Sequence, residues 1–201
     1  MSRYRGPRLK IYRKLGELPG LTRKTSKKMI APGEHGQKSK KPSDYALRLD
    51  EKQKLRFNYG ISEKQLLNYM KIAKKAQGPT GSVLMQILEM RLDNTIFRLG
   101  IAPTIPAARQ LINHGHIKVN ENRLNICSYQ CKPGDIVKVN ENNKSKNLVE
   151  KYLNNPGLTN IPNHLEFNQE HLTGRVNSIV ERDWIALKIN ELLIVEYYSR
   201  K

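Results

Sequence analysis

The sequence predicts an α+β protein with an extended basic arm at its N-terminus. Three observations support this: capped stretches with helical spacing after residue 42, alternating apolar and polar residues between 117 and 139, and a first segment rich in Gly, Pro and Lys with little periodicity. The 201 residues suffice for one large domain or two small ones. We therefore expect helices first, then a small sheet, then a mixed C-terminal region.

Basic residues are concentrated in the arm. The chain has 36 Lys and Arg against 18 Asp and Glu, and residues 1–41 hold 13 basic and 2 acidic residues. This excess indicates a polyanionic partner. Phosphates would order the arm through its cations, and Tyr4 and Tyr12 would stack on bases; the alternative is a solvated tail. The cations concerned are Arg5, Arg8, Arg13, Lys38, Lys40 and Lys41.

Two helices are predicted directly after the arm. Ser43 is a suitable N-cap, Asp44 lies in the first turn, and Gly60 is expected just beyond the C-cap. Ser62 begins the second helix, and Gln65 completes a capping-box pattern. The expected buried face of this helix consists of Leu66, Met70 and Ala73.

A third helix is predicted over 82–100. Its apolar stripe repeats every four residues, at Leu84, Leu88, Leu92 and Ile96. On another side, Arg91, Asn94 and Arg98 recur at helical spacing, so two guanidinium groups would line up along one face. Asp93 lies between these arginines, and we expect it to orient or neutralise them rather than to act in catalysis.

The stretch 104–120 is predicted to switch from helix to strand. Thr104 is the expected N-cap, and Gly115 ends the helix. Arg109 and Asn113, four residues apart, project from one side. The helix buries Ala108, Leu111 and Ile112, whereas the strand buries Ile117 and Val119 and turns Lys118 and Asn120 outward. We hypothesise that these outward polar residues and the arginines of the preceding helix converge on one surface.

The remaining strands are expected beside this one and in the C-terminal third. One begins after the turn at 120–123 with Leu124 and Ile126 inward, and another covers 136–139 after a Pro-Gly turn. Turn residues follow at 154–164, then one or two strands at 165–179. The closing stretch 187–200 fits a short buried helix or a strand, with apolar residues Ile189, Leu192, Leu193 and Val195.

Several classes of function are excluded by missing patterns. Cys127 and Cys131 are the only cysteines, so packing is favoured over disulfide, metal or redox chemistry, and His114 and His116 lack a third ligand nearby. No phosphate-cradling Gly-rich loop or hydrolase motif occurs. Without an apolar run of about 18 residues or a signal sequence, we expect a soluble intracellular protein. The alternative of a basic membrane-surface protein would require an amphipathic helix with a large apolar face, and the sequence predicts none.

Residues 90–139, MRLDNTIFRLGIAPTIPAARQLINHGHIKVNENRLNICSYQCKPGDIVKV, closely resemble the RNA-binding module named after the fourth protein of the small ribosomal subunit. That module also occurs in some pseudouridine synthases, tyrosyl-tRNA synthetases and a heat-shock ribosome-associated protein, so alone it indicates RNA but not the ribosome. The flanks MSRYRGPRLKIYRKLGELPGLT, LRLDEKQKLRFNYGISEKQLL and INELLIVEYYS resemble the arm, first helical region and C-terminus of the ribosomal family itself. The resemblance thus covers essentially the whole chain.

The resemblance implies how the chain is organised. It implies a basic arm at 1–42 and a discontinuous, mainly helical domain made of 43–89 and 177–201. An RNA-binding module is inserted at 90–176, with its core at 90–139, as two helices packed on a small, mainly antiparallel sheet. Within the module the RNA face would involve Arg91, Arg98, Arg109, Gln110, His114, Lys118 and Asn120, with Asn113 beside them.

The resemblance also implies a function without enzymatic activity, cofactor or small-molecule substrate. It implies a structural protein that is a primary binder of the 5′ domain of small-subunit ribosomal RNA, nucleates assembly of the subunit body and contributes to decoding accuracy. Neighbouring ribosomal proteins near the messenger entry path would be further partners. The alternative is an RNA-modifying enzyme or ribosome-associated factor carrying the same module, but the rest of the chain offers too few catalytic candidates.

Two further expectations concern metal and compartment. Many bacterial relatives carry a zinc-binding cysteine cluster in the arm; this arm has no cysteine, so we expect no metal. The segments SRYRGPRLKIYRKLG and LKINELLIVEYYSR are most similar to plastid-encoded and cyanobacterial members. The chain has 18 Asn, 17 Ile and 22 Lys against 14 Arg, which indicates an A/T-rich genome. We therefore expect the chloroplast stroma, with a bacterial cytoplasm as second choice.

Overall fold

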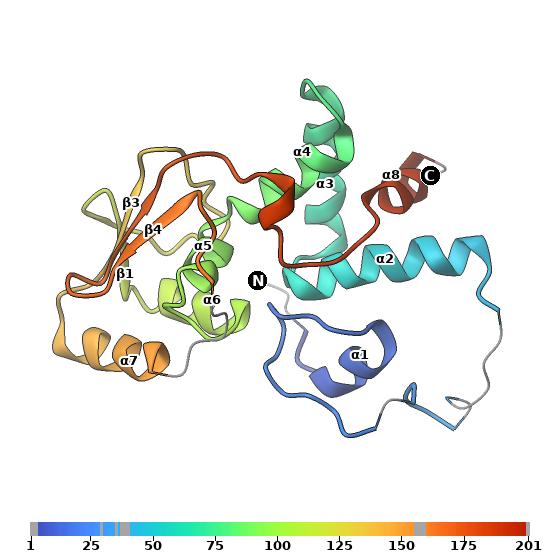
Figure 1. The fold of residues 1–201 in the computed structure, drawn as a ribbon, viewed down its shortest axis with the longest axis horizontal. Coiled ribbons are helices and arrows are strands. Elements are labelled where there is room, and N and C mark those ends of the chain that lie inside the picture. Colours follow the sequence, from blue (N-terminus) through green and yellow to red (C-terminus); the bar gives the residue numbers. More distant parts are fainter. Residues whose placement is uncertain (1–3, 29, 35, 37–40, 155–159, 200–201) are drawn as a thin grey trace. The chain divides into compact units, whose positions relative to one another are not determined.

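The protein is described by a computed structural model that covers residues 4–28, 30–34, 36, 41–154 and 160–199 (Figure 1). The described helices are α1 (Arg8–Leu15), α2 (Asp44–Asn58), α3 (Glu63–Lys75), α4 (Thr80–Glu89), α5 (Leu92–Arg98), α6 (Ile105–Asn113), α7 (Asn143–Leu153) and α8 (Glu191–Ser199). The strands are β1 (Ile117–Val119), β2 (Asn122–Arg123), β3 (Ile136–Val139), β4 (Leu165–Asn168) and β5 (Thr173–Val176). The α+β class is confirmed.

The chain divides into two compact units. The first combines residues 1–84 with 186–201, and the second consists of 85–185. The unit formed from both ends of the chain is mainly helical, and the other contains all the described strands. The finer domain boundaries expected above, after residues 42, 89 and 176, stay a prediction.

The predicted caps of α2 and α3 are confirmed. Ser43 accepts a hydrogen bond from the backbone N–H of Ala46, and Gly60 adopts φ +59° beyond the C-cap, as a Schellman ending requires. Ser62 and Gln65 form the reciprocal capping box. The expected face of α3 is buried, with Leu66, Met70 and Ala73 inside. These short-range signals therefore fix where both helices begin.

The arm contains secondary structure that the sequence did not suggest. Residues 8–15 form α1, and Ile11 and Leu15 are buried. Gly16, at φ +88°, ends this helix, and Leu18 and Leu21 are also buried just after it. The expectation of an aperiodic arm is wrong for this stretch because its flanking Gly and Pro residues end the helix without preventing it.

The C-terminal stretch forms the helix α8, which resolves the choice between helix and strand. Within the first unit it is joined to α2 by the ion pair of Glu196 with Arg48 at 2.7 Å, and to α3 by a hydrogen bond from the Tyr198 hydroxyl to Glu63 at 2.8 Å. The expected apolar face is wrong in part: Ile194 is fully buried, whereas Leu192 is 70% exposed. Tyr197 and Tyr198 provide the rest of the buried side.

The third predicted helix is two helices. It begins at Thr80 rather than at 82, and it breaks between α4 and α5 at Met90 and Arg91. Loop 127–131 pairs with the break: the Cys131 N–H donates to the Met90 carbonyl, and Arg91 forms an antiparallel bridge with Gln130. The stripe Leu84, Leu88, Leu92 and Ile96 is nevertheless buried, as predicted.

The second unit packs helices beside one antiparallel sheet of order β2-β1-β3-β5-β4 (Figure 1). The inner face carries Ile117, Val119, Val137, Val139 and Val176, all buried. On this face a Cβ on Gly174 would collide with the Leu99 side chain, so glycine permits the close approach of the chain after α5. Strands at 136–139 and around Gly174 are confirmed.

Two other features of this unit differ from expectation. The strand after the 120–123 turn contains only Asn122 and Arg123; Leu124 is half-buried and Ile126 is 55% exposed, so their inward orientation was wrong. Helix α7 was not predicted, because its Asn-rich sequence lacks a side-chain N-cap and its buried side includes the small polar Ser145 beside Val149. A two-residue strand and a polar helix leave little periodicity to detect.

Candidate RNA-binding surface

The centre of the candidate surface is the turn from α6 to β1. Thr104 caps α6, and Gly115 ends it at φ +72° in a Schellman arrangement, with the His116 N–H donating to the Leu111 carbonyl. A Cβ on Gly115 would overlap the guanidinium of Arg123. Arg123 lies across this glycine and donates to the His114 carbonyl at 3.2 Å. The turn thus brings a cation from β2 onto the end of α6.

A row of basic residues crosses the outer face of the sheet from this point. In the strand register Lys118 lies directly opposite Arg123 on one side and Lys138 on the other. Side chains directly opposite each other point to the same face, so these three form a basic row. The same line of outward positions continues with the neutral residues Thr173 on β5 and Asn168 on β4. Like charges in such positions destabilise a sheet unless an anion joins them.

The row has little compensating charge of its own. Glu121 forms an ion pair with Lys138, and this contact together with the charge of Lys118 lowers the pKa of the Glu121 carboxyl. Glu121 is exposed, so its pairing is screened by water. By contrast, Arg175 further along the sheet lies opposite Glu166. Positive charge therefore remains in excess at the β2-β1-β3 end, where phosphate oxygens would be attracted.

The structure places the other predicted residues of the junction in different settings. Gln110, Asn113 and His114 are exposed beside the turn, and Asn113 Oδ1 accepts a hydrogen bond from the Cys127 thiol at 3.2 Å. Asn120 has a structural part: it adopts φ +48°, donates to Asp135 at 2.8 Å and accepts from the Ile136 N–H at 2.9 Å. Its amide therefore holds β1 to β3.

The expectation that Arg91 and Arg98 line an exposed face is wrong. Arg91 is 2% exposed and Arg98 5%. Arg91 pairs with Asp93 at 2.8 Å, and Arg98 pairs with Glu89 at 3.0 Å and donates to the Trp184 carbonyl. The prediction assumed one helix over 82–100, on which Arg91 and Arg98 would lie on the same face. The break before α5 changes the direction of these side chains.

Asp93 is the centre of this buried ion-pair network. It pairs with Arg91 and, at 2.7 Å, with Arg109, whose side chain is 15% exposed. The predicted neutralising part of Asp93 is confirmed, although its second arginine is Arg109 rather than Arg98. The expected convergence of the arginines thus occurs partly inside the unit, around a carboxylate, and joins α5 to α6.

Both cysteines and two histidines are neutral groups at physiological pH. Burial raises the pKa of Cys131 to about 12, and burial and the nearby Asp93 raise that of Cys127. These thiols pack inside the unit, as predicted. Burial lowers the pKa of His164, and burial with the charges of His114 and Arg123 lowers that of His116. In the described part of the chain no cluster of three such side chains forms a metal site.

The arm's predicted cations fall into three groups. Arg5 and Lys41 are exposed. Arg8 donates to the Leu21 carbonyl at 3.3 Å, and Arg13 donates to the carbonyls of Ile30 at 2.9 Å and Ala31 at 3.4 Å. Lys38 and Lys40 lie outside the described residues. Arg8 and Arg13 thus stabilise the fold of the arm through hydrogen bonds to its backbone carbonyls.

Sequence reasoning missed Arg123 and Lys138. Neither has a local signal, since only the strand register places them beside Lys118. Alternation did identify Lys118 as outward. A search for basic residues at outward positions of the predicted strands would have found Lys138, whereas Arg123 lies in the predicted turn 120–123 and is placed beside Lys118 only by the register.

Comparison with known proteins identifies the family. Residues 3–89 match the family described as "Ribosomal protein S4/S9 N-terminal domain", and 90–137 match the S4 domain. The chain is 66% identical to "Small ribosomal subunit protein uS4c" of Porphyra purpurea and 67% identical to that of Gracilaria tenuistipitata var. liui. It is 63% identical to "Small ribosomal subunit protein uS4" of Nostoc punctiforme. Each match covers 100% of both chains.

The chain belongs to the uS4 family. Because the match extends through both family regions and the full length, the protein has the ribosomal structural role of this family and is not an enzyme. This excludes the alternative of an RNA-modifying enzyme with an appended module. Among the described helices of this uS4 member, none combines the length and apolar character needed to cross a membrane.

Proposed function

We propose that this chain is a primary binder of the 5′ domain of small-subunit ribosomal RNA and nucleates assembly of the subunit body. The observation that carries the proposal is the basic row of Lys118, Arg123 and Lys138, set at the α6–β1 turn of an S4 domain. Three neighbouring cations with one exposed carboxylate favour a polyanion. Full-length similarity to small-subunit proteins supports ribosomal RNA as that polyanion.

Binding would proceed in two stages. The arm and the basic row first capture RNA through long-range attraction, which is independent of sequence. Folded RNA is then recognised by shape, through contacts to phosphates and 2′-hydroxyls. Within the second unit we assign these contacts to the exposed Gln110, Asn113 and His114, to the accessible edge of Arg109, and to the row. Arg91 and Arg98 support this surface from inside.

The proposal extends to partners and compartment. Relatives of plastid and cyanobacterial origin support a ribosome in the plastid or in the bacterial cytoplasm, and we propose the chloroplast stroma. Other small-subunit proteins near the messenger entry path are the proposed protein neighbours. Through them the chain would contribute to decoding accuracy. A reporter for misreading in cells whose gene carries substitutions in the exposed residues would test this part.

Footprinting on small-subunit RNA, with and without the full chain, tests the main proposal. We expect protection confined to one helical junction of the 5′ domain. If about eight phosphates are neutralised, affinity should also fall roughly 10³- to 10⁵-fold between 50 and 200 mM salt. Diffuse protection would make the chain a non-specific binder, and a complex insensitive to salt would refute electrostatic capture.

A further inference from the structure

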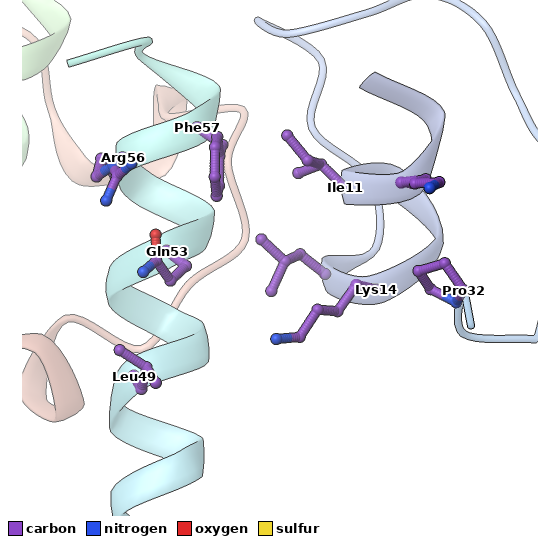
Figure 2. A pocket seen from close by; sticks show the side chains of 9 residues that line it. Ile11, Lys14, Pro32, Leu49, Gln53, Arg56 and Phe57 are labelled. Atoms are coloured by element: carbon purple, nitrogen blue, oxygen red, sulfur yellow. The ribbon is translucent and has the colours of Figure 1, made fainter. Parts of the chain in front are cut away.

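A cleft of about 340 Å³ lies between α1 and α2 in the first unit (Figure 2). Much of its lining is apolar: Ile11 from α1 faces Leu49 and Phe57 from α2, and Leu15 of α1 also lines the cleft. Pro32 also lines the cleft, and Arg13 donates to the carbonyls of the nearby residues 30 and 31. The volume is at the small end of ligand pockets, which span about 300–1,000 Å³.

Cations surround this apolar interior. Lys10, Lys14 and Arg56 line the same cleft, and in Figure 2 Lys14 extends from α1 toward α2. Among the described residues, two of them pair with carboxylates at long distance, Lys14 with Asp50 at 3.9 Å and Arg56 with Glu63 at 3.9 Å. Arg56 also lies 5.1 Å from the centre of the Phe57 ring. These three cations are called the rim of the cleft. An apolar cleft with a cationic rim suits a ligand that combines a flat apolar group with an anionic group.

Gln53 adds a specific requirement. It lines the cleft from α2, and its side-chain Oε1 is buried without a hydrogen-bond partner. A buried acceptor left unpaired is costly and unusual in a folded protein. The terminal torsion of glutamine is broad, so we infer that rotation about it can turn this oxygen toward an occupant of the cleft. An occupant that donates an N–H would satisfy it.

We propose that the cleft between α1 and α2 binds one unpaired nucleotide of RNA, with its base between the apolar walls, a base N–H donating to Gln53 Oε1, and its phosphate on the rim of Lys10, Lys14 and Arg56. This inference rests on the proposed RNA-binding function and specifies one subsite of it. It places a contact to an RNA base in the first unit, in addition to the basic row of the second unit.

The chemistry of the cleft favours a nucleotide over other occupants. All four RNA bases carry an N–H or amino donor on the edge used for pairing, and extruded bases are commonly recognised by apolar or aromatic walls with a hydrogen bond to that edge. A peptide side chain such as Leu would fill the walls but leave Gln53 unpaired. A free phosphate would meet the rim but leave the walls empty. Only the combined ligand matches all three features.

The test uses the full chain on small-subunit RNA and probes the pairing edges of unpaired bases with dimethyl sulfate and carbodiimide. Gln53→Leu removes the acceptor at similar volume, and Leu49→Trp fills the cleft. Gln77→Leu, at an exposed glutamine outside the cleft, is the matched control. Thermal unfolding of each variant confirms that it is folded. Hydroxyl-radical cleavage records the backbone footprint independently of the bases.

We expect a nucleotide protected by the unmodified chain and by Gln77→Leu to become reactive with both cleft variants, while the backbone footprint is kept. Affinity should fall about 2- to 10-fold for Gln53→Leu, as for loss of one hydrogen bond. If every base stays protected with both cleft variants, the subsite is refuted while RNA binding stands. If the unmodified chain itself gives no footprint, the proposed function fails and this inference fails with it.

Discussion

The second unit contains two sets of cations with opposite settings. Arg91, Arg98 and Arg109 lie inside or at the edge of the unit, each within 3.0 Å of a buried carboxylate of Asp93 or Glu89. The basic row of Lys118, Arg123 and Lys138 lies on the sheet surface, and within the described part of the chain its one ion pair joins Lys138 to the exposed Glu121. The first set is neutralised by buried carboxylates of the same unit, whereas the second keeps an excess of positive charge on the surface.

This difference teaches that the neighbours of a basic residue, and not its charge alone, decide its part. A guanidinium removed from water requires a carboxylate, since burying an unpaired charge costs several kcal/mol. A cation kept in water tolerates like charges nearby at small cost. Buried arginines thus shape the module, and in the proposed function the surface lysines and arginine of the basic row attract the RNA. Each prediction below tests one side of this division.

Substitution of Asp93 should have the largest effect. Asp93→Ala leaves Arg91 buried without its carboxylate and removes the link from α5 to α6 through Arg109. Breaking a buried pair in this way typically costs about 3–5 kcal/mol. We expect the free energy of unfolding, measured with urea, to fall by that amount. Circular dichroism at each urea concentration would follow the transition.

Glu121→Ala is the matched control on the exposed side. It also removes a carboxylate from a basic partner, Lys138, but the group is exposed. We expect no measurable change in the urea midpoint for this variant. Equal destabilisation by both substitutions would contradict the division between buried and exposed cations.

The buried network also shows why part of the site could not be predicted from the sequence. Spacing identified Asp93 as a partner of arginines, because a carboxylate two residues from Arg91 is a local feature. It could not show that α4 ends before Arg91, since no Gly or Pro marks that break. The break depends on pairing with residues 127–131, a distant segment. The direction of Arg91 and Arg98 therefore depends on tertiary structure.

Asn120 should give the next largest effect. Its side chain makes two hydrogen bonds, to Asp135 and from the Ile136 N–H, and its φ of +48° is unfavourable for most residues. For Asn120→Ala we expect a loss of about 2–4 kcal/mol in the free energy of unfolding, from two hydrogen bonds and backbone strain. Asn120→Gly also removes the two hydrogen bonds, but glycine adopts a positive φ without strain, so the free energy of unfolding should fall less than for Asn120→Ala. If glycine were the worse of the two, strain would not contribute.

The basic row should affect binding without reducing stability. Lys118→Gln, Arg123→Gln and Lys138→Gln each remove one cation from a set of like charges. We expect each to leave the urea midpoint unchanged or slightly raised, and to reduce the slope of log affinity against log salt by about 1. Filter binding to small-subunit RNA at several salt concentrations would measure that slope.

Lys151→Gln is the control for this series, because Lys151 is exposed on α7 and outside the row. Its salt slope should stay at the value of the unmodified chain. If the row variants changed the slope no more than this control, the phosphate contacts would lie elsewhere and the proposed surface would be wrong.

The row illustrates the opposite limit of sequence reasoning. Caps at Ser43, Ser62 and Thr104 were predictable because the hydrogen bonds involved join residues three apart. Arg123 and Lys138 are fifteen positions apart and meet only through β1, so their proximity depends on strand register. The resemblance predicts a surface centred on the α6–β1 turn, and the strand register adds Arg123 and Lys138 to the residues proposed for it.

The smallest predicted effect is a dependence of stability on pH, which distinguishes the two settings through their histidines. His164 is buried near the pair of Glu89 and Arg98; burial lowers its pKa, the charge of Glu89 opposes this, and that of Arg98 adds to it. His116 lies at the row, where burial and the charges of His114 and Arg123 lower its pKa. Both groups ordinarily titrate near 6.5.

A histidine with a lowered pKa in the folded state binds fewer protons than it does when the chain is unfolded. Stability is therefore complete above about pH 6.5 and falls as the pH drops from there toward the folded-state pKa values. Urea unfolding at pH 7.5 and 5.5 should show this fall, in a range where most carboxylates stay ionised. His164→Leu should remove more of it than His116→Gln, because burial is greater at residue 164. An equal or larger loss of the pH dependence in His116→Gln would contradict the expectation that the more buried histidine makes the larger contribution.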